Sequence, residues 1–171
     1  MTGVTADGAG GPGPDRTVER LVATMTRAGL TLATAESLTG GGLAARVVDV
    51  PGASAVLRGG VVAYATDLKA RLLGVDEELL SRRGAVDPDV ALAMASGVRL
   101  LLGADVGVST TGVAGPEPQD GVAPGTVYIA VDDGRGRPLV RRLELEGARD
   151  AVRSQTVAAA LHLVLEVVDH A

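Results

Sequence analysis

The sequence contains no cysteine, phenylalanine or tryptophan, and its 171 residues include only two histidines and two tyrosines. Without cysteine the chain can form no disulfide bond, no thiolate nucleophile and no zinc site with thiolate ligands. Neither histidine belongs to a metal-ligand motif, so a histidine-rich metal site is not expected. The core must be built from Leu, Val, Ala, Ile and Met.

Positive charge is also scarce. The formal net charge is −5, and no basic run stands out. A nucleic-acid surface needs clustered Lys and Arg, so nucleic acid is not an expected partner. No apolar run is judged long enough to span a bilayer, and the first residues lack the pattern of a secretory signal. These absences predict a cytoplasmic protein with no membrane partner.

The composition favours one folded domain preceded by a short tail. Residues 1–14 are rich in Gly and Pro, which predicts a flexible segment. Residues 15–171 have the length of a single domain, and a hydrophobic content of 46% is ample for one core.

Apolar periodicity predicts a leading helix that stops near Gly29, followed by alternating strands and helices. The predicted strands are 32–35, 55–64, 106–111, 125–133 and 139–145, and the later helices are 43–48, 66–73, 87–102 and from about 148 onward. The last two strands flank Asp133-Gly134-Arg135-Gly136 and form a predicted hairpin. This order predicts an α/β fold with a mostly parallel mixed sheet, covered by helices, and one antiparallel edge hairpin.

The segment Thr34-Ala35-Glu36-Ser37-Leu38-Thr39-Gly40-Gly41-Gly42 lies where a buried strand gives way to a helix. The first N–H groups of a helix lack internal partners, and the helix dipole makes this end mildly electropositive. Glycines let a ligand approach the backbone, and Ser37 and Thr39 add hydroxyls. The segment suits an anion or a developing oxyanion. The alternative is that Ser37 or Thr39 simply caps the helix.

A second strand-to-helix junction carries Tyr64 and Lys69. Lys69 is the only lysine, and the other fifteen basic residues are arginine. Since lysine can lose its proton and arginine cannot, its retention suggests a need for a neutral amine. The alternative is an exposed helix lysine. Thr111 ends a third strand, so we expect Ser37, Tyr64 and Thr111 at the sheet edge where such folds bind ligands.

Four motifs resemble, in order and spacing, the CinA C-terminal domain family, which includes the nicotinamide mononucleotide (NMN) amidohydrolases, or NMN deamidases. The motifs are Glu36-Ser37-Leu38-Thr39-Gly40-Gly41, Tyr64-Ala65-Thr66-Asp67-Leu68-Lys69, Gly84-Ala85-Val86, and Thr111-Gly112-Val113-Ala114-Gly115-Pro116 with Gly125-Thr126-Val127-Tyr128. The resemblance implies a three-layer α/β/α sandwich. It also implies conversion of NMN and water to nicotinic acid mononucleotide and ammonia, without a metal or other cofactor.

The resemblance further implies a serine nucleophile assisted by a tyrosine and a lysine, which map onto Ser37, Tyr64 and Lys69. Either Tyr64 or Lys69 is then the base closest to the serine. We expect the N–H groups near Thr39 to Gly41 to stabilise the oxyanion. The residues expected to bind substrate are Glu36, Thr39, Gly40, Gly41, Thr111, Gly112 and Arg149.

Within that set, Thr111, Gly112 and Arg149 are the candidates for the phosphate, although Arg149 is about as consistent with an ordinary surface arginine. Glu117-Pro118-Gln119-Asp120 stands where many family members have an acidic residue and glycines, so this loop is expected to shape the pocket. The alternative function is a nucleotide-binding or regulatory protein that lacks turnover. The apolar end of the last helix favours a homo-oligomer.

Overall fold

The computed structural model describes residues 16–136 and 138–170. The predicted tail, residues 1–14, lies outside this part of the chain. The strands are β1 (Leu32–Glu36), β2 (Leu57–Val62), β3 (Val106–Gly112), β4 (Thr126–Asp132) and β5 (Leu139–Glu144). The helices are α1 (Arg16–Ala28), α2 (Gly42–Val48), α3 (Thr66–Leu73), α4 (Glu77–Arg83), α5 (Pro88–Leu102) and α6 (Arg149–Asp169), with a 3-10 turn at Ala53–Ala55.

The five strands form one mixed sheet in the order β2-β1-β3-β4-β5. Strands β2 and β3 run parallel to β1, whereas β4 is antiparallel to β3 and to β5. Glu36 at the end of β1 pairs with both Val62 and Thr110. The carboxyl ends of the three parallel strands therefore coincide at one edge, as the sequence predicts. The predicted edge hairpin, β4–β5, is confirmed.

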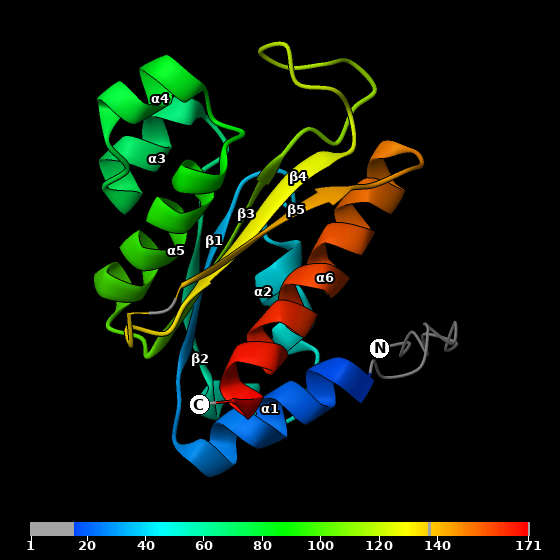
Figure 1. The fold of residues 1–171 in the computed structure, drawn as a ribbon. Coiled ribbons are helices and arrows are strands. Elements are labelled where there is room, and N and C mark those ends of the chain that lie inside the picture. Colours follow the sequence, from blue (N-terminus) through cyan, green and yellow to red (C-terminus); the bar gives the residue numbers. More distant parts are fainter. Residues whose placement is uncertain (1–15, 137, 171) are drawn as a thin grey trace, which may run out of the picture.

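Helices cover both faces of the sheet (Figure 1). On one face α3, α4 and α5 enclose a core with Ala33 and Ala35 of β1. On the other face α1, α2 and α6 enclose a larger core that includes Leu32, Val108 and Ile129 from the strands. The three-layer α/β/α architecture is therefore confirmed.

Two local features refine the predicted elements. Helix α4 was not predicted, because its seven residues include only two large apolar side chains; Asp76 caps its start by accepting a hydrogen bond from the N–H of Leu79. Beside the glycine pair in β2, the register of the pairing between β2 and β1 shifts, an irregularity of the kind that glycine in a strand indicates. A Cβ atom on Gly60 would collide with the side chain of Thr34, so the two backbones can approach only with glycine there.

Helix α6 corrects one expectation from composition. By length and composition it is long and apolar enough to cross a membrane, although no such segment was expected. In the folded chain its apolar residues Leu161, Leu163 and Val164 are buried in the core, which explains its hydropathy. Because the chain itself covers this end of the helix, the observation that favoured a homo-oligomer no longer supports one, and the oligomeric state stays a prediction.

Candidate active site

The side chain of Glu36, at the end of β1, stabilises the turn that follows this strand. Its carboxylate accepts hydrogen bonds from the backbone N–H groups of Gly41, Leu43 and Ala44, at 2.9–3.0 Å. Gly41 is the N-cap residue of α2, and Leu43 and Ala44 lie in its first turn, so the glutamate side chain caps the helix and complements its dipole. Gly40 and Gly41 have φ angles of 60° and 97°, which glycine adopts without strain.

This arrangement settles the capping alternative for Ser37 and Thr39. Neither side chain caps α2, because Glu36 already satisfies those N–H groups. The Thr39 hydroxyl instead contacts the Thr110 hydroxyl at 2.8 Å. The hydroxyl of Ser37 is left for Lys69.

Ser37 and Lys69 form a buried pair. The Lys69 ammonium group lies 3.1 Å from Ser37 Oγ and 2.9 Å from the carbonyl oxygen of Ala63. Lys69 is 1% exposed and Ser37 is 9% exposed. Burial disfavours the charged amine and lowers the pKa of Lys69 from its usual 10.5 to about 8. Lys69 is therefore no ordinary surface lysine.

A cavity of about 140 Å³ opens onto this pair. Its walls come from the turn after β1, from Tyr64 and Lys69, from residues 85–86, from the loop after β3 and from Arg149. Thr111 lines it too, and its hydroxyl donates a hydrogen bond to the carbonyl of Ala85 at 2.6 Å. Gly112 forms part of the same wall, so both residues predicted from the third strand reach the cavity.

Tyr64 and Arg149 lie together at the open end of this cavity. The Arg149 guanidinium donates to the Tyr64 hydroxyl at 2.8 Å and to the carbonyl of Gly115 at 3.0 Å. Tyr64 is 58% exposed, and no hydrogen bond joins it to Ser37 or Lys69. Glu117 and Gln119 line the same opening. We call Tyr64, Glu117, Gln119 and Arg149 the cavity mouth.

Four of the predicted substrate-binding residues do not line this cavity. Glu36 is buried, and its carboxylate accepts hydrogen bonds from the turn and from α2. These contacts stabilise the turn. Thr39 is buried, its carbonyl accepts a hydrogen bond from Arg153 of α6, and Gly40 and Gly41 connect it to α2. All four residues lie at the end of β1 or on the turn as predicted, and their part in substrate binding stays a prediction.

The predicted oxyanion donors also need correction. The N–H of Gly40 donates to the carbonyl of Ser37, and the N–H of Gly41 donates to Glu36. Within the described part of the chain, the N–H groups of Leu38 and Thr39 have no hydrogen-bond partner. Leu38 lines the cavity beside Ser37. Two unpaired N–H groups therefore remain next to Ser37: that of Leu38, which lines the cavity, and that of Thr39, which follows it.

Two contributions to the site were not foreseen. Ala85 and Val86 belong to a motif noted in the sequence, but only the fold shows that they form a cavity wall. Arg153 donates hydrogen bonds to the carbonyls of Leu38 and Thr39, directly after Ser37. Its spacing from Arg149, four residues along one helix, was the available signal that the two share a face.

The arrangement is chemically suited to nucleophilic attack. An uncharged Lys69 can accept the Ser37 proton, while its own N–H groups keep the bond to Ala63. At pKa of about 8, roughly a tenth of the Lys69 side chains are neutral at pH 7.

Known proteins share both the sequence and the fold. The chain matches the CinA C-terminal domain over residues 15–168. A CinA-like protein of Frankia casuarinae is 50% identical over 162 residues, which make up 94% of this chain and 37% of that protein. A CinA-like protein of Geobacter sulfurreducens is 47% identical over 149 residues, 86% of this chain and 36% of that protein. The chain thus spans a little over a third of the length of these relatives.

Solved structures of related proteins have a similar fold. The competence/damage inducible protein CihA from Agrobacterium tumefaciens has a TM-score of 0.86 and 34% identity, over 90% of this chain and 94% of that one. A CinA superfamily protein from Klebsiella pneumoniae has a TM-score of 0.87 and 33% identity, over 91% of this chain and 98% of that one.

Proposed function

Since the chain belongs to the CinA C-terminal domain family, we propose that it is an amidohydrolase in which Ser37 is the nucleophile and Lys69 is the base. The proposed reaction is hydrolysis of the carboxamide of NMN to nicotinic acid mononucleotide and ammonia, in the cytoplasm. The observation that carries this proposal is the 3.1 Å contact between the Lys69 amine and the Ser37 hydroxyl, both buried at the closed end of a cavity.

In the first half of the reaction, Ser37 Oγ attacks the carboxamide carbon and its proton passes to the neutral amine of Lys69. The carbonyl π electrons move to the oxygen, which becomes an oxyanion. We assign its stabilisation to the unpaired N–H groups of Leu38 and Thr39, a contribution of about 3 kcal/mol per donor in comparable sites. Lys69 then returns the proton to the amide nitrogen as the C–N bond breaks, and ammonia leaves.

In the second half, water attacks the acyl-serine. Lys69 accepts a proton from that water and donates it to Ser37 Oγ as the ester bond breaks, so the serine is regenerated and a carboxylic acid is formed. The acid ionises at neutral pH. Lys69 alone serves both halves in this scheme, since Tyr64 contacts Arg149 and neither member of the pair.

The size of the cavity supports a substrate that is only partly enclosed. At about 140 Å³ it is smaller than the roughly 300 Å³ of a typical site for a whole drug-sized ligand. We therefore place the carboxamide ring inside and the ribose phosphate at the cavity mouth. The guanidinium of Arg149 has five N–H donors and the structure uses two, so it retains donors for a phosphate.

The test is ammonia release from NMN by the wild type and by Ser37→Ala, together with NMN binding by calorimetry. We expect the variant to bind NMN and to lose turnover by a factor of ~10³ or more. Ser81→Ala, an exposed serine on α4, is the matched control and should keep full activity. Wild-type protein that binds NMN without releasing ammonia would instead favour the alternative, a nucleotide-binding or regulatory protein without turnover.

A further inference from the structure

Helix α6 brings two arginines to opposite sides of the nucleophile turn. Arg149 reaches the cavity mouth, where it holds Tyr64 and Gly115. Arg153, one helical turn later, donates from Nε to the carbonyl of Leu38 at 3.0 Å and from Nη2 to the carbonyl of Thr39 at 2.8 Å. Both carbonyls belong to the two residues that follow Ser37.

The hydrogen bonds of the Arg153 side chain go to these two carbonyl oxygens. Within the described residues Arg153 forms no ion pair, although Asp150 lies on the same helix and lines, together with Arg153, a cleft between α2 and α6. A planar guanidinium with two parallel donors fixes the orientation of its acceptors more tightly than a single-donor contact does. A partly buried charge directed at two backbone carbonyls is thus a strong constraint on the turn.

Peptide geometry carries this constraint to the reacting groups. The carbonyl of Leu38 and the N–H of Thr39 belong to one planar peptide unit and point in opposite directions. Holding this carbonyl toward α6 turns the Thr39 N–H away from α6. The carbonyl of Thr39 shares a peptide unit with the N–H of Gly40, which donates to the carbonyl of Ser37 itself. Both peptide units therefore connect Arg153 to the position of Ser37.

We propose that Arg153 is a positioning residue, which sets the backbone after Ser37 so that Ser37 Oγ meets Lys69 and the N–H of Thr39 keeps its direction. This inference rests on the proposed role of Ser37 as nucleophile. Glu36 anchors the inner side of the turn through α2, and Arg153 anchors its outer side. Arg153 touches no reacting atom in this scheme.

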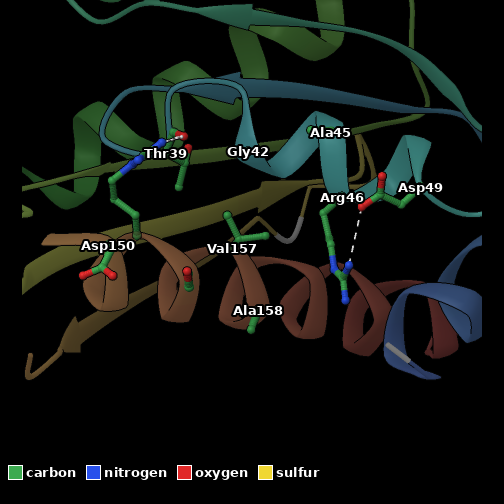
Figure 2. Close-up of a pocket in the computed structure, with 10 residues that line it drawn as sticks. Thr39, Gly42, Ala45, Arg46, Asp49, Asp150, Val157 and Ala158 are labelled. Atoms are coloured by element: carbon green, nitrogen blue, oxygen red, sulfur yellow. Dashed lines mark hydrogen bonds and ion pairs between the residues drawn. The ribbon is translucent and has the colours of Figure 1, made fainter. Parts of the chain in front are cut away.

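The cleft behind the turn makes the proposal testable by chemical rescue. Between α2 and α6 lies an open cleft of about 490 Å³ that is lined by Thr39, Arg46, Asp150 and Arg153 itself (Figure 2). It is separate from the cavity at Ser37, since the two have no lining residue in common. Shortening Arg153 to alanine would open the position of its guanidinium to small cations from solvent.

The experiment measures the rate at which a fluorophosphonate labels Ser37, by mass spectrometry of the peptide. In this reaction the serine oxygen bonds to phosphorus, fluoride leaves and the serine proton is lost. Arg153→Ala should label about 10²-fold more slowly than the wild type, the effect of a misplacement near 1 Å. Millimolar guanidinium chloride should restore much of that rate, whereas sodium chloride at equal ionic strength should not. Arg153→Lys should fall between the two, since an ammonium lacks the fork that fits both carbonyls.

The matched control is Arg141→Ala. Arg141 also binds α6, through an ion pair with Glu166 at 3.0 Å, but it belongs to β5, which is three strands away from β1 in the sheet, and it lines neither cavity. This variant should label at the wild-type rate, with or without guanidinium. Circular dichroism of each variant at the assay temperature establishes that it is folded.

An unchanged labelling rate in folded Arg153→Ala, or a loss that guanidinium does not restore, would overturn the positioning role and leave the nucleophile in place. A wild-type protein in which Ser37 is not labelled would overturn the proposed nucleophile, and this inference with it.

Discussion

The two ends of the cavity differ in how firmly they are built. At the closed end, Ser37 and Lys69 are buried and joined to each other, and the turn that carries Ser37 is held by Glu36 and Arg153. At the cavity mouth, Tyr64, Glu117, Gln119 and Arg149 are exposed, and within the described residues only Tyr64 and Arg149 of these four are joined by a side-chain hydrogen bond. Chemistry requires a geometry fixed to a fraction of an ångström, whereas substrate selection tolerates adjustable groups. The difference supports the proposal that catalysis takes place at the closed end and that the mouth selects the substrate.

The largest effect short of removing the serine should come from Lys69→Arg. A guanidinium keeps the positive charge but cannot act as a neutral base, and its larger head does not fit the buried site between Ser37 and Ala63. We expect kcat for ammonia release to fall by about 10²–10⁴-fold, as for loss of a general base. Lys69→Arg that retained most of the turnover would remove the closed end from the mechanism.

The pH dependence should report the same lysine. In the proposed mechanism the neutral form of Lys69 is the active one, so kcat/KM should rise about tenfold per pH unit below 8 and level off above it. A pH–rate profile for the wild type measures this directly. A profile that is flat between pH 6 and about 9 would contradict the assignment of Lys69 as the base.

The lowered pKa of Lys69 should also make the stability of the fold depend on pH. Between pH of about 8 and 10.5 the unfolded chain retains a proton that native Lys69 has lost, so the free energy of unfolding should rise with pH in this window. Lys69→Met removes the titrating group and is the control. The difference in unfolding free energy between wild type and Lys69→Met, from urea titrations, should shift in favour of the wild type as pH rises. A difference independent of pH would show that the native pKa is not lowered.

At the mouth, effects should be smaller and should depend on the substrate. Arg149→Ala removes a guanidinium from the proposed phosphate position, and we expect KM for NMN to rise about tenfold, the value of a charge-assisted hydrogen bond. Hydrolysis of the phosphate-free riboside should change much less, apart from any effect of losing the bond to Tyr64. Equal losses for the two substrates would mean that Arg149 supports the mouth without binding phosphate.

Glu117→Gln should have the smallest effect. Glu117 places a negative charge at the mouth, exposed to solvent, and repulsion of a phosphate across water is weak. We expect KM for NMN to fall by about two- to threefold at low salt, with kcat unchanged, and this gain should vanish as salt is added. A large change in kcat would place Glu117 in the chemistry and break the division between the two ends.

The sequence predicts most of the framework, because that framework depends on local patterns. Apolar strands and glycine-rich ends identify β1, β2 and β3, and parallel strands bring their ends together at one sheet edge. The resemblance to the CinA C-terminal domain family predicted that Ser37 and Lys69 act together, and the single lysine among arginines predicted an unusual environment for its amine. Helix α4 was missed because it presents too few apolar residues to show a period.

What the sequence does not predict is the side of the turn to which each group points. Glu36 and Ser37 are neighbours, yet one side chain turns to α2 and the other to the cavity. This choice depends on the φ angles of Gly40 and Gly41 and on the capping needs of α2, which only the folded backbone defines. The contact of Arg153 with the turn could not be predicted either, because its partner Leu38 lies 115 positions away in the chain.

The central claim is that the reaction passes through an acyl group on Ser37. The most direct measurement mixes wild-type protein with NMN, quenches the reaction in acid within the first turnover, and determines the mass of the peptide that contains Ser37. The account predicts a fraction of this peptide carrying the nicotinoyl nucleotide as an ester, formed together with the first ammonia, sensitive to hydroxylamine and absent in Lys69→Arg. Ammonia release at the full rate, with no adduct on Ser37 and no hydroxamate when hydroxylamine is added, would contradict it.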